Sequence, residues 1–144
     1  MDAHIERARE GDAAAILRLL EEQHLPLDGL LDHLATIIVA RQNGSIVGSA
    51  ALEVYPDGAL MRSVAVSSRV QGTGLGHRLT DAAIQLARDV GSPAIYLLTT
   101  TADRYFPRFG FEPIERSRVP VTVQASVEFT SACPSSATVM RKSL

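Results

Sequence analysis

The stretch Val64-Ala-Val-Ser-Ser-Arg-Val-Gln-Gly-Thr-Gly-Leu-Gly76 decides the fold, because it joins an apolar strand to a long helix through a glycine-rich loop. Residues 60–66 form a mostly apolar run that suits a buried central strand. Residues 74–90 carry leucine, alanine and valine at helical spacing, and Gly91-Ser-Pro93 ends this helix. Such a loop places several backbone N–H groups at the positive end of a helix dipole, which favours binding of an anion.

The glycine spacing argues against the two common nucleotide-binding loops. A dinucleotide fold requires Gly-x-Gly-x-x-Gly with an acidic residue about 20 positions later, whereas residues 72–76 read Gly-x-Gly-x-Gly and no such acid follows. A Walker loop requires Gly-Lys-Ser/Thr, which the loop lacks. The plain alternative is that the glycines only make a tight turn between strand and helix.

The rest of the chain predicts a mixed α/β (α+β) protein. Residues 60–66 and 94–100 can pair as parallel strands, because a helix connects them in a right-handed crossover. Residues 119–129 are ambiguous between strand and helix, and Pro120 favours helix. The other expected elements are helices at 13–22 (with Asp12 as N-cap), from Asp28 and at 102–108, and strands at 37–41, 46–54, from Phe111 and at 137–141.

Bulk properties are those of an ordinary globular protein of 144 residues, for which we expect one domain over residues 1–144. The formal net charge of -2 gives no basic excess to attract nucleic acid or an anionic membrane, so small-molecule partners are expected. The single cysteine, Cys133, favours a cytoplasmic location and is interpreted as structural or pocket-lining. The four histidines are scattered, and no metal site is predicted.

Two motifs carry a family resemblance. Gln71-x-x-Gly74-x-Gly76, between Val64-Ala-Val66 and a long helix, resembles the coenzyme A-binding motif of the GNAT superfamily of N-acetyltransferases, and 106–111 resembles that family's second signature. The resemblance implies one domain with a mixed sheet of about six to seven strands, splayed between strands four and five and flanked by about four to five helices. It also implies acetyl-CoA as co-substrate, held by Val64, Ala65, Val66, Gln71, Gly72, Thr73, Gly74, Leu75, Gly76 and His77.

The resemblance further implies a bulge after Val64 that frees a strand amide, that of Val66 or Ala65, to stabilise the oxyanion of the reaction. Glu53, a carboxylate in an apolar strand, is a candidate base with a raised pKa; alternatively it points to solvent. Arg62 is expected to share a face with Val64 and Val66 and to clamp a substrate carboxylate, or else to form a salt bridge with Glu53.

The general acid departs from the family pattern. The family often has a tyrosine four residues before Gly-Phe, but Phe106 stands there and the neighbouring Tyr105 is the candidate, with core packing as its alternative role. Alternatively the thiolate leaves unassisted, or a hydroxyl of Thr99, Thr100 or Thr101 contributes. Thr99 and Thr100 are also candidates for substrate binding.

Residues 51–55, 61–66, 96–102 and 128–137 resemble the arsenic-resistance-linked (ArsN-type) N-acetyltransferases and, more distantly, the acetyltransferase domain of N-acetylglutamate synthases. The resemblance implies a primary amine of an amino acid or a similar small molecule as acceptor, and makes a homodimer reasonable. Two alternatives stay open: a non-catalytic module that binds acetyl-CoA for regulation, and a protein or peptide N-acetyltransferase.

Overall fold

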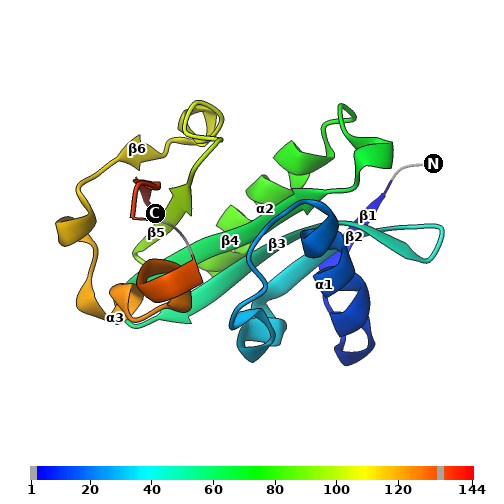
Figure 1. Cartoon of the computed structure of the whole chain (residues 1–144), viewed down its shortest axis with the longest axis horizontal. Coiled ribbons are helices and arrows are strands. Elements are labelled where there is room, and N and C mark those ends of the chain that lie inside the picture. The colour runs from blue at the N-terminus through cyan, green and yellow to red at the C-terminus, as the bar shows by residue number, and fades with distance from the viewer. Residues whose placement is uncertain (1–2, 133–134) are drawn as a thin grey trace.

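A seven-stranded mixed sheet with the strand order β1-β2-β3-β4-β5-β7-β6 forms the centre of the molecule (Figure 1). The computed structural model describes residues 3–132 and 135–144. β4 and β5 pair in parallel and the other neighbours are antiparallel, so the predicted mixed sheet is confirmed. The strands are β1 His4–Arg7, β2 Ile37–Gln42, β3 Ser45–Tyr55, β4 Gly58–Val66, β5 Ala94–Thr99, β6 Glu112–Pro113 and β7 Thr138–Ser143. The α-helices are α1 Ala13–Glu22, α2 Leu75–Asp89 and α3 Val121–Gln124.

Helices cover both faces of the sheet, because successive strand residues point to opposite sides. Ile37 and Val39 of β2 pack toward α1, which buries Ile16, Leu19 and Leu20 against them. Ile38 and Ala40 point the other way, into the core under α2, together with Leu79, Ala83 and Ala87. In Figure 1, α1 and α2 accordingly lie on opposite sides of the strands. The amphipathic helices predicted at 13–22 and 74–90 are therefore present, and they cover opposite faces of the sheet.

Several local predictions need correction. The helix expected from Asp28 is the 3-10 helix Leu30–Thr36. Gly29 precedes it and has a left-handed backbone conformation, with a φ of 69°. Pro107 leaves only a 3-10 turn, Phe106–Phe109, where a helix over 102–108 was expected. The side chain of Asp12 does not cap α1. It accepts hydrogen bonds instead from the Arg9 amide, at 2.8 Å, and from the Arg41 guanidinium. β1 was not predicted, since four residues of mixed polarity carry little periodicity.

The predicted splay between the fourth and fifth strands is present. β4 and β5 pair only at Ala59↔Ile95 and Leu60↔Tyr96. On its other side, β4 shifts register against β3, because Ala51 faces Arg62 while Ser49 faces Ala65, which leaves one extra residue in β4. This bulge contains Ser63, whose φ is 59°, and Ser49 Oγ donates to its carbonyl at 2.7 Å. The bulge thus precedes Val64, whereas the resemblance to the GNAT family implied a bulge after this residue.

The bulge also overturns the expected position of Arg62. An extra residue reverses the alternation of faces, so Arg62 lies on the same face as Ala65, and Ala65 packs with Ala51 beneath α1. Val64 and Val66 pack into the core on the α2 side. The expectation that Arg62 shares a face with these two valines is wrong, because strand parity does not hold across a bulge.

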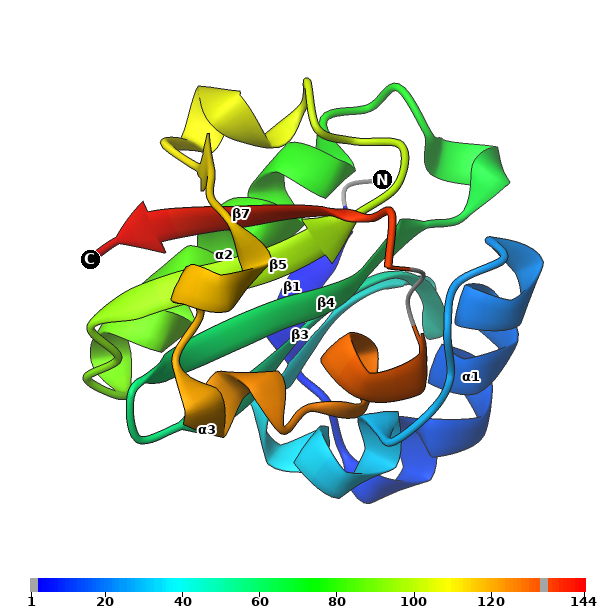
Figure 2. The ribbon, with the colours of Figure 1, turned by 60° about the vertical axis from the view of Figure 1, so that its left-hand side comes forward.

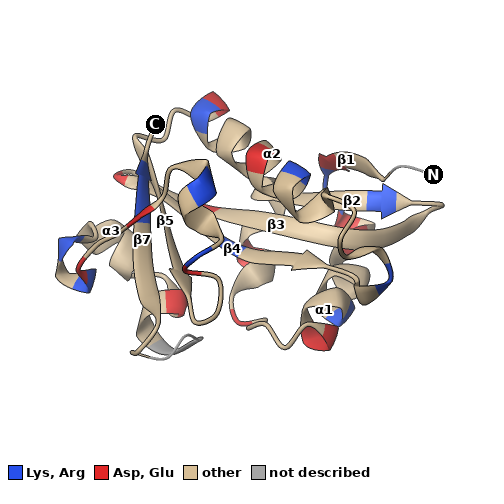
Figure 3. Cartoon of the chain, turned by 90° about the horizontal axis from the view of Figure 1, so that it is seen from above, with Lys and Arg blue, Asp and Glu red and all other residues tan. Residues whose placement is uncertain are grey.

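The C-terminal part returns over the face that carries α1. α3 begins directly after Pro120, in agreement with the helical interpretation of 119–129, and a single π-helical turn, Glu128–Ala132, follows. This turn lies beside the segment that follows α1 (Figure 2), where Val127 Cγ1 closely approaches Gly29. Basic and acidic residues are interspersed over the elements (Figure 3). None of the helices in the described ranges is long and apolar enough to cross a membrane.

Candidate active site

A groove of about 500 Å³ runs between the end of β4 and the start of α2. Nine of the ten residues predicted to contact acetyl-CoA line it: Val64, Ala65, Val66, Gln71, Gly72, Gly74, Leu75, Gly76 and His77. Gly72 and Gly74 have φ of 83° and 84°, a conformation that other residues adopt only with strain. No aspartate or glutamate among the described residues lines the groove, whereas Arg108 does. The groove therefore suits a ligand that carries phosphate groups.

Side chains of the loop hold its shape. Gln71 Nε2 donates to the Val66 carbonyl at 3.0 Å and to Gln23 Oε1 at 3.3 Å, which connects the loop to the end of α1. Thr73 is the one residue of the ten predicted to contact acetyl-CoA that does not line the groove. Its hydroxyl donates to the Val70 carbonyl at 2.7 Å. His77 pairs with Asp81 at 3.1 Å.

The direction of the strand amides follows from the ladder between β3 and β4. The Ser67 amide donates to the Val47 carbonyl at 2.8 Å. Since neighbouring residues of a strand direct their amides to opposite edges, the Val66 amide points away from β3, toward the open splay. Ala65 faces Ser49 across the ladder. Of the two predicted oxyanion donors, Val66 is thus the one that the ladder leaves available.

A second cavity, of about 490 Å³, lies in the splay between β4 and β5. The predicted substrate residues Arg62, Thr99 and Thr100 line it, and Glu53 does not. Thr99 Oγ1 accepts from the Ala102 amide at 2.8 Å and so holds the turn after β5. Leu25, Val64 and Tyr105 line both this cavity and the groove, so the two meet at these three residues.

Tyr105 lies where the cavity and the groove meet. Its hydroxyl would be 3.7 Å from a Cβ at Gly76, at the start of α2. Its ring packs edge-on against Phe106 and Phe109, with centroid distances of 5.2 and 5.3 Å, and the Arg108 guanidinium covers it at 4.6 Å. Tyr105 therefore combines packing contacts with a hydroxyl at the junction, whereas Phe106 is buried.

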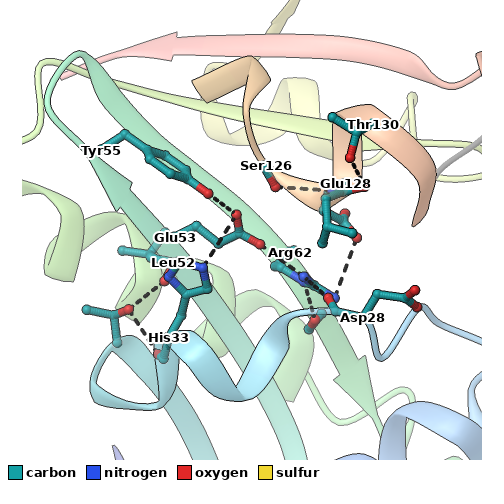
Figure 4. A network of polar contacts seen from close by, with 12 residues as sticks. Asp28, His33, Leu52, Glu53, Tyr55, Arg62, Ser126, Glu128 and Thr130 are labelled. Carbon is teal, nitrogen blue, oxygen red and sulfur yellow. Dashed lines mark hydrogen bonds and ion pairs between the residues drawn. The ribbon is translucent and has the colours of Figure 1, made fainter. Parts of the chain in front are cut away.

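A buried charge network joins three segments beside the cavity (Figure 4). Arg62 Nη1 lies 2.9 Å from Glu53 Oε2, and both side chains are only 1% exposed. Arg62 also donates to the carbonyls of Pro26 (3.1 Å) and Asp28 (2.6 Å), and its Nη2 lies 3.6 Å from Glu128 Oε2. The salt bridge that the sequence offered as the alternative for Glu53 and Arg62 is therefore present, and Glu53 does not point to solvent.

The environment of Glu53 lowers its pKa, which corrects the expected rise. Burial raises the pKa of this carboxyl, but hydrogen bonds from Ser126, Tyr55 and Arg62 together favour the charged form more strongly. His33 Nε2, 3.7 Å away, acts in the same direction when it is protonated. Burial and the bond to Glu53 in turn raise the pKa of Tyr55 to about 12. Glu53 is thus held as a carboxylate among donors.

Some lining residues were not predicted from the sequence. Gln23 and Leu25 follow α1, Arg108 follows Tyr105 by three residues, and Glu128 comes from the C-terminal turn. Arg108 had a recoverable signal, since it stands inside the second signature, whereas the others reach the site only through tertiary folding. Cys133 lies outside the described residues. Among the described residues, no group of three or more histidine, cysteine, aspartate or glutamate side chains could hold a metal ion.

Residues 4–111 match the family model described as "Acetyltransferase (GNAT) family". The chain belongs to this family. The matched range includes the glycine loop and both walls of the groove, and the predicted enzyme class, an acetyltransferase, is confirmed with it.

Similar GNAT sequences are named amino-acid acetyltransferases. One from Neisseria meningitidis is 31% identical over 127 residues, which cover 82% of this chain and 29% of that protein. Another, from Mycobacterium tuberculosis, is 33% identical over 132 residues, which cover 83% of this chain and 73% of the relative. The chain thus spans less than a third of the length of its Neisseria relative.

Two solved structures are similar over nearly the whole chain. Rv2747 from Mycobacterium tuberculosis, solved with CoA, superposes with a TM-score of 0.83 at 27% identity, covering 98% of this chain and 99% of Rv2747. N-acetylglutamate synthase from Neisseria gonorrhoeae, solved with coenzyme A and N-acetyl-glutamate, gives 0.82 at 26% identity, covering 100% of this chain and 35% of the synthase. These similarities confirm the predicted fold class.

Proposed function

We propose that the chain is an acetyl-CoA-dependent N-acetyltransferase whose acceptor is the primary amine of an amino acid or a similar small molecule. One observation carries the proposal: the acceptor-sized cavity opens into the cofactor groove at Leu25, Val64 and Tyr105. A thioester at this junction would meet an amine from the cavity without further rearrangement of the sheet. The arrangement supplies the proximity that acyl transfer needs.

The glycine loop would hold the phosphates of acetyl-CoA. Backbone amides at the N-terminus of α2, a helix of 15 residues, favour negative charge, and the groove presents no described carboxylate to oppose it. Arg108 adds a positive charge to the lining of the groove. The pantetheine arm would then follow the edge of β4 from Val66 toward Val64.

The edge of β4 would also stabilise the oxyanion. The Val66 amide points into the splay, and Val64, two residues earlier, lies on the same side because strand directions repeat every two residues. Val66 lines only the groove, whereas Val64 lines groove and cavity alike. We therefore assign the thioester carbonyl to the Val64 amide and the pantetheine to the Val66 amide. This proposal replaces Val66 and Ala65, which were the oxyanion donors predicted from the sequence. Loss of one such donor costs about 100-fold or more in other acyl-transfer enzymes.

Proton transfers complete the reaction. The neutral amine nitrogen forms the new bond to the acetyl carbon, the carbon–sulfur bond breaks, and the sulfur takes its proton from the Tyr105 hydroxyl, which regains one from solvent. The surplus proton on nitrogen leaves to water. Glu53 is poorly suited as the base, because its lowered pKa and its donors favour the ionised, bonded state and it does not line the cavity. We assign to Glu53 the positioning of Arg62.

The acceptor class rests on the relatives and on the shape of the cavity. Proteins similar to this chain are named amino-acid acetyltransferases, and a structural neighbour was solved with N-acetyl-glutamate. The C-terminal turn and the segment after α1 border the cavity through Glu128 and Pro26, so it suits a small molecule better than a protein chain. The arsenic-linked resemblance, a cytoplasmic location and a homodimer stay predictions.

A thiol-release assay with acetyl-CoA tests the proposal. The acceptor panel contains amino acids, amino-acid analogues including phosphinic and arsenic ones, polyamines, aminoglycosides and peptides. We expect release with at least one amino acid, and no release with peptides at the same concentration. Tight binding of acetyl-CoA without release for any acceptor would instead identify a regulatory module, and release with peptides alone would identify a protein acetyltransferase.

A further inference from the structure

Ser63 is a strained residue in the wall of the acceptor cavity. It belongs to the β4 bulge, it has a φ of 59°, and it lines the cavity directly before Val64. A serine adopts this left-handed conformation at a cost in free energy, because its Cβ crowds the backbone. Residues that are held in such conformations cluster at ligand-binding and active sites. The strain therefore points to a role for the Ser63 side chain in the cavity.

Two hydrogen bonds fix Ser63. Its carbonyl accepts from Ser49 Oγ at 2.7 Å, and its own Oγ accepts from Arg62 Nε at 3.1 Å. Arg62 is in turn held by Glu53 at 2.9 Å and by two backbone carbonyls (Figure 4). Since the Arg62 side chain is only 1% exposed, its Nε stays beside Ser63. The buried charge network thus determines where the Ser63 hydroxyl lies.

The Ser63 hydroxyl is better suited to donate a hydrogen bond than to accept a second one. A serine hydroxyl carries one O–H donor and two acceptor lone pairs, and the Arg62 guanidinium already uses one lone pair. Within residues 3–132 and 135–144, no hydrogen bond is donated by this hydroxyl. A bond from a cationic donor polarises the O–H group and strengthens the next bond in the chain. The hydroxyl therefore suits an anionic partner.

The position of Ser63 makes this partner a group of the acceptor and not of the cofactor. Ser63 lines the cavity alone, whereas the neighbouring Val64 lines both the cavity and the groove. The Nε, Nη1 and Nη2 of Arg62 all donate to protein atoms, so a carboxylate that bound this guanidinium directly would have to displace them. Thr100 and Thr101 also bring hydroxyls to the cavity, but they are exposed on the loop after β5.

We propose that Ser63 binds the α-carboxylate of the acceptor amino acid through a hydrogen bond that Arg62 strengthens; this inference rests on the proposed N-acetyltransferase function. The carboxylate and the amine of an α-amino acid are attached to the same carbon atom. A carboxylate bound beside Val64 therefore places the amine where the cavity meets the groove, close to the thioester. Arg62 acts through Ser63 in this arrangement, and not as a direct clamp on the substrate.

An amino acid and the amine that lacks its carboxylate provide the test. The pair is the L-amino acid with the highest kcat/KM in the thiol-release assay and its matching amine, for example L-leucine with isoamylamine or L-glutamate with γ-aminobutyrate. In Ser63→Ala we expect kcat/KM for the amino acid to fall about tenfold or more, as for loss of a hydrogen bond to a charged group. The value for the amine should change little. Each variant is compared with the wild type on the same substrate, so the different basicities of the two amines cancel.

Ser63→Gly and Ser49→Ala separate binding from structure. Glycine adopts a φ of 59° without strain and also lacks the hydroxyl, so Ser63→Gly should show the same selective loss even if Ser63→Ala shifts the bulge. Ser49→Ala removes the bond to the Ser63 carbonyl and leaves the Ser63 hydroxyl in place, so any loss should be equal for the two acceptors.

Three results would overturn the inference. Equal losses for both acceptors in the folded Ser63 variants, or no loss for either, refute the binding role of Ser63 while the proposed acetyl transfer stands. A wild-type protein that uses the amine as well as the amino acid shows that the carboxylate is not bound, and this result needs no variant to fold. Absence of transfer to every amine, with acetyl-CoA bound, overturns the proposed function itself and this inference with it.

Discussion

Replacement of Glu53 by glutamine separates a structural carboxylate from a catalytic base. Glutamine keeps the shape and one acceptor oxygen, but it removes the charge that faces Arg62 at 2.9 Å. It also turns an amide NH₂ toward a site where Arg62, Tyr55 and Ser126 all donate. The Arg62 side chain is 1% exposed and so has no water to replace the lost partner. We expect the variant to be destabilised more than it is slowed.

The magnitude follows from the geometry. Two unit charges at this separation attract by about 6 kcal/mol at an effective dielectric constant of about 20. Part of this is returned, because the buried carboxylate no longer has to be desolvated and Glu128 still lies 3.6 Å from Arg62. A net loss of about 3 kcal/mol is therefore expected, at the lower end of the range for breaking a buried pair. For a domain of this size it corresponds to a melting temperature about 10 °C lower.

Thermal and urea unfolding measure the stability of Glu53→Gln, Arg62→Met and the double variant. We expect the double variant to be more stable than the sum of the single changes predicts, by about 2 kcal/mol, because the second change removes the uncompensated charge. Below the melting range of the variant, kcat should stay within about tenfold of wild type. An unchanged melting temperature with a loss of about 100-fold or more in kcat would refute the structural assignment and restore Glu53 as the base.

Three further outcomes are expected. The KM for acetyl-CoA should be about tenfold higher in Gly76→Glu than in Gly76→Gln, because a side chain at this position lies between Val66 and Tyr105 in the groove. Only the glutamate side chain carries a charge that repels phosphate. Equal KM values for the two variants would mean that the phosphates bind elsewhere. Tyr105→Phe should lower kcat about tenfold with little change in KM, as single-turnover kinetics can show, and an unaffected kcat would mean that the thiolate leaves unassisted. The pKa of Asp12 is lowered to about 2, mainly by the hydrogen bond from Arg41. The stabilisation by this carboxylate is therefore present above about pH 4 and is lost as the pH falls toward about 2. Urea titrations should show a loss of about 2 kcal/mol at most in the wild-type protein and no such loss in Asp12→Asn.

The cofactor half of the site was predictable because its determinants are local. The positions of Gly72, Gly74 and Gly76 in the sequence specify where backbone amides cluster before α2. Gln23, Leu25, Tyr105 and Arg108 then join the groove from other parts of the chain. The helices α1 and α2 were predictable for the same reason, since 3.6-residue periodicity over 13–22 and 74–90 is strong.

The acceptor half was less predictable because it depends on register. One extra residue at Ser63 moves Arg62 to the other face of the sheet, and no composition rule marks that serine as the bulge. The pKa of Glu53 is lowered by hydrogen bonds from Ser126, Tyr55 and Arg62, whereas its apolar neighbours in the strand predicted a raised pKa. Glu128 reaches the cavity from a π-helical turn 75 residues away from Glu53, a contact that sequence spacing does not reveal.

This division has a consequence for how function transfers between relatives. Most of the groove is built from residues 64–77, and Gln23, Leu25, Tyr105 and Arg108 complete it. The cavity is assembled from the segment after α1, from β4 and β5, and from the C-terminal turn. Arg62 of β4 contacts both the segment after α1 and the C-terminal turn. A change in any of these elements can therefore alter the acceptor while the glycine loop stays as it is. Similarity to amino-acid acetyltransferases thus supports the acetyl donor directly, whereas the acceptor has to be inferred from the residues that line this chain's own cavity.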